Sequence, residues 1–120
     1  MTNARVLVID DELVLRALIH DMLSVCGYQA DVAADGPTAI SRFKQQRYDA
    51  VITDLVMPGM DGFQVASALR TIDPAVKIIM LTGSAPEMTA RRARETGVTL
   101  LHKPIALGQL KAAVDAACGA

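Results

Sequence analysis

Aromatic residues are scarce in this 120-residue sequence, which has no Trp, two Phe and two Tyr. A net charge is also nearly absent, because 12 Lys and Arg stand against 13 Asp and Glu. The sequence therefore lacks the basic excess that neutralises nucleic-acid phosphates, and we expect no direct binding to nucleic acid. It also lacks a long apolar run and a signal-peptide pattern, so we expect no membrane span and a cytoplasmic location.

Cysteine is scarce as well, and Cys26 and Cys118 stand far apart without CxxC spacing. Both fall at apolar positions of predicted helices, where a free thiol packs as a small hydrophobic group. A chain of this length with 52% hydrophobic residues can bury one core without disulfides or a structural metal. The sequence therefore predicts a single globular domain over residues 1–120.

Short apolar segments alternate with segments of helical periodicity along the whole chain. Five segments are short and rich in β-branched and aliphatic residues, and we predict strands at 5–9, 28–33, 50–53, 76–81 and 99–101. Most of them are almost continuously hydrophobic, as is typical of parallel strands covered by helices on both faces.

The clearest predicted helix follows the first strand and carries an apolar stripe of Leu15, Leu18, Ile19, Met22 and Cys26. Further helices are predicted at 36–46, at 61–69 with Asp61 as N-cap, at 86–96 as a short exposed helix, and at 107–117. This alternation predicts an α/β domain with a doubly wound parallel sheet. In such folds, functional residues collect at the carboxyl ends of the strands.

Carboxylates follow two of the predicted strands. Asp10, Asp11 and Glu12 follow the first, and Asp54 follows the third. Adjacent carboxylates repel unless a cation joins them, so this group suits a hard cation such as Mg²⁺. The alternative is that Asp11 caps the first helix and Glu12 interacts with its dipole.

The segment after Asp54 has the composition of a shaped turn. Pro58 fixes its own φ, Gly59 can adopt a positive φ, and Asp61-Gly62 leads into the next helix. Such a turn could hold backbone groups near a metal or an anion, although an ordinary strand-to-helix loop would also have this composition.

The last two strands end at Thr82-Gly83-Ser84 and at Lys103-Pro104. Taken alone, Thr82 is an N-cap candidate and Lys103 a solvated cation. Taken with the carboxylates, the hydroxyl and the ammonium suit phosphoryl transfer to a carboxylate, in which each group would contact one oxygen of the transferred phosphoryl group.

These residues resemble the receiver domain of response regulators, the flavodoxin-like module of two-component signalling, across essentially the whole chain. The shared signature consists of Asp10 and Asp11, the D-x-x-M-P-x-M-D-G segment from Asp54 to Gly62, Thr82 with Gly83, and Lys103 with Pro104. The resemblance implies a five-stranded parallel sheet in the order 2-1-3-4-5 with five helices.

The resemblance also implies that Asp54 accepts a phosphoryl group from a phosphohistidine on a sensor histidine kinase or a histidine phosphotransfer protein. Mg²⁺ would be held by Asp11, Asp54 and the backbone carbonyl of Val56, with Asp10 acting through water. The protein would then be a signalling phosphoacceptor rather than an enzyme, although it would assist its own phosphorylation and dephosphorylation.

By the same resemblance, Lys103 would contact the phosphoryl group and Thr82 would move towards it, changing the surface around the fourth helix, fifth strand and fifth helix. A downstream effector could read that surface. The Lys103-Pro104 bond is often cis in this family. Two positions depart from the common pattern, because Leu100 replaces a switch aromatic and Ile105 replaces a Phe.

Two further groups of residues have weaker assignments. Arg91, Arg92 and Arg94 mark the helix at 86–96 as a candidate partner surface, with a simply solvated helix as the alternative. His20, close to where receivers meet their kinases, and His102 are expected to be surface residues. No residues remain for an effector, so we expect a domain that works alone or forms part of a longer protein.

Two other functions compete with this hypothesis. A phosphohydrolase of the haloacid dehalogenase type needs a second Asp two residues after its nucleophile, and Val56 occupies that position. A pseudo-receiver that only binds proteins remains an alternative. The apolar Val56 also predicts slow loss of the phosphoryl group, because it would hold the attacking water poorly.

Overall fold

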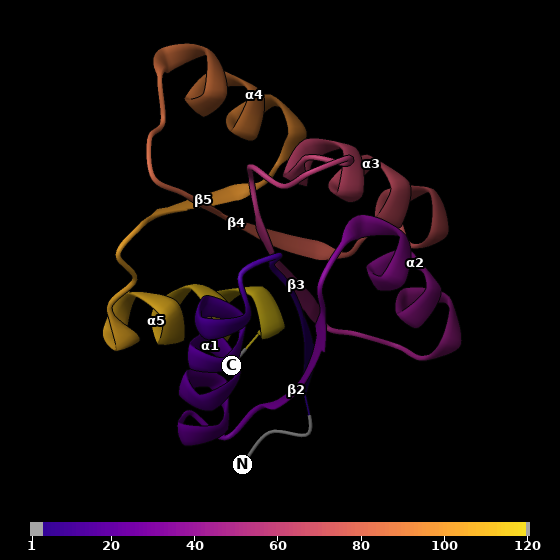
Figure 1. The fold of residues 1–120 in the computed structure, drawn as a ribbon, viewed down its shortest axis with the longest axis vertical. Coiled ribbons are helices and arrows are strands. Elements are labelled where there is room, and N and C mark those ends of the chain that lie inside the picture. The colour runs from indigo at the N-terminus through magenta and orange to yellow at the C-terminus, as the bar shows by residue number, and fades with distance from the viewer. Residues whose placement is uncertain (1–3, 120) are drawn as a thin grey trace.

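The computed structural model describes residues 4–119, in which a five-stranded parallel sheet lies between two layers of helices (Figure 1). The elements in chain order are β1 (Arg5–Ile9), α1 (Leu13–Val25), β2 (Gln29–Ala33), α2 (Gly36–Gln45), β3 (Ala50–Asp54), α3 (Gly62–Ile72), β4 (Lys77–Thr82), α4 (Glu87–Thr96), β5 (Thr99–His102) and α5 (Leu107–Cys118). The strand order is β2-β1-β3-β4-β5, as predicted. None of the helices described is long and apolar enough to cross a membrane.

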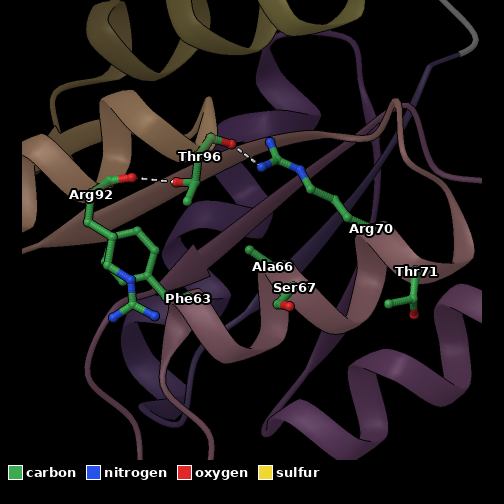
Figure 2. Close-up of a pocket in the computed structure, with 7 residues that line it drawn as sticks. All are labelled: Phe63, Ala66, Ser67, Arg70, Thr71, Arg92 and Thr96. Carbon is green, nitrogen blue, oxygen red and sulfur yellow. Dashed lines mark hydrogen bonds between the residues drawn. The ribbon is translucent and has the colours of Figure 1, made fainter.

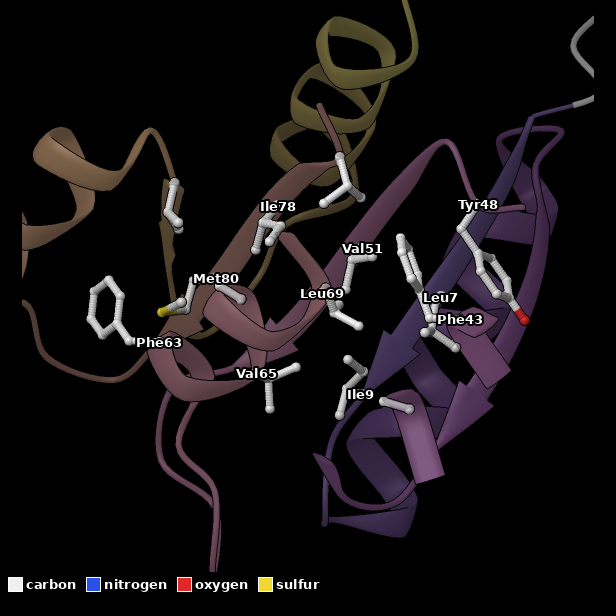
Figure 3. Close-up of a cluster of buried hydrophobic side chains, with 14 of the residues drawn as sticks. Leu7, Ile9, Phe43, Tyr48, Val51, Phe63, Val65, Leu69, Ile78 and Met80 are labelled. Atoms are coloured by element: carbon white, nitrogen blue, oxygen red, sulfur yellow. The ribbon is translucent and has the colours of Figure 1, made fainter. Parts of the chain in front are cut away.

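Two apolar clusters cover the two faces of the sheet. The first packs strand residues such as Leu7, Val51 and Met80 against Phe43 of α2 and Leu69 of α3 (Figure 3). The second packs Val6, Val8, Ile52, Ile79 and Leu81 against Ile19 and Leu23 of α1 and Leu110 and Val114 of α5. Successive residues of a central strand alternate between the clusters, which explains why those strands are hydrophobic at nearly every position.

The boundaries and faces differ from the prediction at a few positions. β2 begins at Gln29 rather than Tyr28, and β3, β4 and β5 each extend one residue further, to Asp54, Thr82 and His102. In α1, Leu18 is 48% exposed while Leu23 is fully buried. The apolar stripe therefore placed Leu18 wrongly, because the buried side of α1 follows Ile19 and Leu23, which are four residues apart.

The start of α3 is fixed against the end of β3. Asp61 caps the helix, as predicted, and forms a capping box with Gln64, with hydrogen bonds of 2.9 and 2.8 Å. The next residue, Gly62, leaves no room for a side chain, because a Cβ atom there would lie 2.7 Å from the carbonyl oxygen of Asp54. The glycine thus allows α3 to begin directly beside the strand that ends in Asp54.

The fourth helix, α4, is exposed, as predicted. Among its ten residues, all of which are described, Ala93 is the buried one and Met88 is 83% exposed. Cys26 and Cys118 are free, half-buried and packed against the second cluster, in agreement with a packing role. Burial raises the pKa of the Cys118 thiol to about 11.

Candidate functional site

The site lies at the carboxyl ends of β1, β3 and β4 and in the loop after β5. Asp54 is the last residue of β3, and the pairing of Ile9 with Thr53 places Asp10 of the neighbouring strand at the same edge. The Nζ atom of Lys103 lies 3.0 Å from Oδ1 of Asp54. The nearly buried Asp54 carboxylate thus forms an ion pair with an ammonium group that is itself 25% exposed.

Asp10 is fully buried and only partly hydrogen-bonded. Its Oδ1 atom accepts a 2.8 Å hydrogen bond from the N–H of Glu12. Its Oδ2 atom is buried and has no hydrogen-bond partner within residues 4–119. Burial raises the pKa of Asp10, and the charges of Asp54 and Asp11 raise it further, while the Glu12 N–H and the Lys103 ammonium oppose that rise.

Three carboxylates converge at this edge. One oxygen each from Asp10, Asp11 and Asp54 lies within 4.8 Å of the others. The unpartnered buried oxygen of Asp10 and the repulsion among the three charges fit a hard divalent cation, which takes oxygen ligands. Asp11 is exposed, so the group can be reached from solvent.

The part of the alternative in which Asp11 caps the first helix is wrong, whereas the interaction of Glu12 with the helix dipole stays a prediction. Glu12 occupies the N-cap position of α1 but makes no side-chain capping bond. The Asp11 side chain makes no hydrogen bond in the described part of the chain, whereas Asp10 accepts the N–H of Glu12. The Asp11 carboxylate therefore belongs to the group at the edge of the sheet and does not cap α1.

Thr82 ends β4 beside this group but is engaged elsewhere. Its hydroxyl donates to the carbonyl oxygen of Ser84 and accepts the Ser84 N–H at 3.2 Å. The N-cap of α4 is Pro86, so the N-cap alternative for Thr82 is wrong. The exposed Gly83 lies within this turn. The carbonyl oxygen of Thr82 accepts the Lys103 N–H at 2.8 Å, which joins the β4 and β5 loops.

The remaining predicted residues surround the site. The Lys103-Pro104 peptide bond is cis. Leu100 is half-buried, pairs with Met80 across β4 and β5, and packs against the first apolar cluster. Val56 is 75% exposed two residues beyond Asp54. A metal contact by its backbone carbonyl stays a prediction.

Sequence reasoning missed one contact and one groove. The guanidinium of Arg16 in α1 donates to the backbone carbonyl of Asp10 at 2.7 Å. An apolar groove of about 380 Å³ runs beside Lys103, lined by Leu15, Leu18, Ile19, Met22, Pro104 and Ile105. The apolar Leu18 and the replacement of Phe by Ile105 were the signals that the sequence offered. His20 is half-exposed and contacts Asp21, and His102 is exposed.

Comparisons with known proteins agree with this geometry. Sporulation initiation phosphotransferase F of Bacillus subtilis is 30% identical over 115 residues, covering 95% of this chain and 93% of that protein. Sensor protein EvgS of Escherichia coli is 36% identical over 107 residues, which are 88% of this chain but 9% of that protein. The structure of chemotaxis protein CheY4 of Vibrio cholerae superimposes with a TM-score of 0.91 at 29% identity, covering 97% of this chain and 99% of that one.

The curated relatives thus range from proteins of the same length to much longer ones, so the match concerns this domain. The family model of the response regulator receiver domain matches residues 6–115. The three carboxylates and the Lys103 ammonium lie together at one edge of the sheet, and Thr82 ends β4. The chain therefore belongs to the family of response regulator receiver domains of two-component signalling.

Proposed function

We propose that this receiver domain accepts a phosphoryl group on Asp54 from a phosphohistidine of a partner protein, in a reaction that depends on Mg²⁺. The observation that carries the proposal is the Lys103 ammonium, 3.0 Å from Asp54 Oδ1, at an edge where two more carboxylates converge. A carboxylate held between an ammonium and a cation-binding group can act as a nucleophile towards phosphorus.

In the proposed reaction, an Asp54 oxygen forms a bond to phosphorus while the bond from phosphorus to the partner's imidazole nitrogen breaks. That nitrogen keeps the electron pair and takes up a proton, so an aspartyl phosphate and a neutral histidine result. The Lys103 ammonium donates to an oxygen of the transferring group and offsets its negative charge.

Asp10, Asp11, Asp54 and the carbonyl of Val56 would hold the Mg²⁺, which supplies positive charge next to the phosphoryl oxygens when bound. The Thr82 hydroxyl donates to Ser84 in this structure. To donate to a phosphoryl oxygen it must leave Ser84, and the loop before α4 would move with it. The surface of α4, β5 and α5 would then differ between the two states, and a downstream effector could bind one of them.

The partner must approach the edge at which α1 begins. Leu13 and Val14 in the first turn of α1 are 69% and 80% exposed, and the apolar groove beside Lys103 continues this surface. Exposed apolar side chains next to a charged site are typical of a protein-binding surface. We infer that a sensor histidine kinase or a histidine phosphotransfer protein docks here and that the domain acts in the cytoplasm.

Incubation with acetyl phosphate and Mg²⁺ tests the proposal. Intact mass spectrometry should show the gain of one base-labile phosphoryl group, which Asp54→Ala and the addition of EDTA should abolish. Asp21→Ala, which removes an exposed carboxylate of α1, should leave the gain unchanged. No gain in the wild type would favour a pseudo-receiver that only binds proteins, and an equal gain in Asp54→Ala would show that another group is modified.

A further inference from the structure

The helix α4 is attached to the domain by unusually little apolar contact. Ala93 is the buried residue among the ten described α4 residues, and Met88 points its long apolar side chain into solvent. A groove of about 410 Å³ separates α4 from α3 along part of their length. Because little apolar surface is buried, α4 can shift at a small cost in free energy.

Two arginines bridge this groove instead (Figure 2). The Cζ atom of Arg92, on α4, lies 4.3 Å from the centre of the Phe63 ring of α3. The guanidinium of Arg70, on α3, donates to the carbonyl oxygens of Thr96 and Gly97 at the C-terminal end of α4. The end of α4 is thus fixed by hydrogen bonds, whereas its middle is held by a cation–π contact.

Phe63 connects this contact to the proposed phosphorylation site. Phe63 follows Gly62 in the chain, and the N–H of Gly62 donates to the Leu55 carbonyl at 2.8 Å. Because Gly62 has no side chain, its backbone can lie against the Asp54 carbonyl. Residues 83–86 join Thr82 to the first residue of α4, Glu87. Within this loop, the carbonyl oxygen of Ser84 accepts a hydrogen bond from the Thr82 hydroxyl. The residues next to Asp54 therefore contact the side of α4 through Phe63, and the loop after Thr82 leads into the start of α4.

We propose that Arg92 is a positioning residue, whose stack on Phe63 holds α4 in the place it takes without a phosphoryl group on Asp54. The proposal rests on the function proposed above. When the Thr82 loop moves towards the phosphoryl group, α4 pivots about its end at Arg70 and Arg92 leaves the Phe63 ring.

Hydrogen exchange of the unphosphorylated protein tests the first half of the proposal. Arg92→Ala should speed exchange of the α4 amides about two- to fivefold, the range expected for loss of an exposed cation–π contact. Arg91→Ala is the matched control, because it removes the same charge from the adjacent, exposed α4 residue, whose side chain makes no hydrogen bond, ion pair or ring contact within residues 4–119. Arg92→Lys, which keeps the cation, should restore part of the protection. Equal exchange in the two alanine variants would overturn the proposal.

The rate of phosphorylation tests the coupling. If the stack favours the unphosphorylated state, its loss must favour the phosphorylated one, so Arg92→Ala should gain the phosphoryl group from acetyl phosphate up to fivefold faster than Arg91→Ala. An unchanged rate together with faster exchange would show that the contact only anchors α4, and would overturn the coupling. If the wild type gains no phosphoryl group, the proposed function fails, while the exchange result still reports on the stack itself.

Discussion

Aspartates lie near both ends of the parallel sheet, but their surroundings differ. At the amino end, Asp49 accepts the N–H of Arg5 at 2.9 Å. Next to it, in the edge strand β2, Oδ2 of Asp31 accepts hydrogen bonds from the Tyr48 hydroxyl and the Gln46 amide, both at 2.7 Å. The guanidinium of Arg5 lies 3.4 Å from the same oxygen. We refer to Arg5, Asp31, Gln46, Tyr48 and Asp49 as the amino-end network.

At the carboxyl end, Asp10, Asp11 and Asp54 form a group in which one buried oxygen lacks a partner within residues 4–119. The Lys103 ammonium compensates one of these carboxylates. The carboxylates of the amino-end network accept hydrogen bonds from within it and so contribute to stability, whereas the carboxyl-end group includes a buried oxygen that is open to a ligand. Identical side chains thus support the fold in one group, while the other group is the site proposed for phosphorylation.

Removal of the Lys103 ammonium from the carboxyl-end group should have the largest effect, which is on the rate of phosphorylation. We expect Lys103→Met to slow phosphorylation by acetyl phosphate about 100-fold, because the variant lacks the charged donor that offsets the transferring group. Time-resolved intact mass spectrometry measures the rate. Lys111→Met is the control, since Lys111 pairs with Asp115 on α5 at 2.6 Å, away from the site. Similar rates in the two variants would mean that Lys103 takes no part in the transfer.

A change in the amino-end network should instead affect stability alone. Asp31→Ala leaves the buried Tyr48 hydroxyl without its acceptor and the Gln46 amide with the Tyr48 oxygen alone, which should lower the free energy of unfolding by about 2 kcal/mol. Urea denaturation measures this loss, and the exposed Asp21→Ala should change the stability by less than about 0.5 kcal/mol. The phosphorylation rate of the folded variant should equal that of the wild type. A slower rate would remove the distinction between the two ends.

Neutralising a carboxylate of the carboxyl-end group should change the free energy of unfolding by less than Asp31→Ala does. The change should have the opposite sign, so the variant should be more stable than the wild type. Because the pKa of Asp10 is raised in the folded protein, ionising this group opposes folding. Asp10→Asn should therefore raise the free energy of unfolding at pH 7 by about 1 kcal/mol in EDTA, since it removes the charge from an incompletely hydrogen-bonded site.

The pH dependence of that difference checks its cause. Wild type and Asp10→Asn should be equally stable below the usual pKa of Asp, about 3.9. As the pH rises through the raised pKa of Asp10, the wild type should lose stability relative to the variant. Added Mg²⁺ should stabilise the wild type more than the variant. If Asp10→Asn unfolds more easily in EDTA at pH 7, the carboxyl-end charge does not destabilise the fold.

The fold could be predicted from the sequence because its signals are local and repeated. Apolar runs marked the strands to within one residue at each end, and the family signature implied their order. The face of α1 was predicted less well, because the burial of Leu23 and the exposure of Leu18 depend on how α1 lies against the sheet. Side-chain periodicity alone does not determine that orientation.

The composition of the site could also be predicted, since carboxyl ends of parallel strands meet at one edge. The hydrogen-bond and stacking partners of the side chains could not be predicted. Nothing in the sequence indicated that Thr82 would donate to Ser84, that Arg16 would reach the Asp10 carbonyl, or that Arg92 would stack on Phe63. These contacts join residues through loop geometry and helix packing, for which the sequence offers no periodic signal.

The smallest predicted effect concerns Val56, the exposed apolar residue beside the carboxyl-end group. A valine side chain cannot hydrogen-bond the water that attacks the aspartyl phosphate, whereas an asparagine amide can orient it. Val56→Asn should therefore shorten the lifetime of the phosphorylated protein severalfold, as followed by the loss of phosphoryl mass after the donor is removed. Val56→Leu should leave the lifetime unchanged, and an unchanged lifetime in Val56→Asn would mean that water reaches Asp54 from another side. The stability of all three proteins should be the same, because the Val56 side chain is largely in solvent, so any change in lifetime would report on the chemistry of the carboxyl end alone.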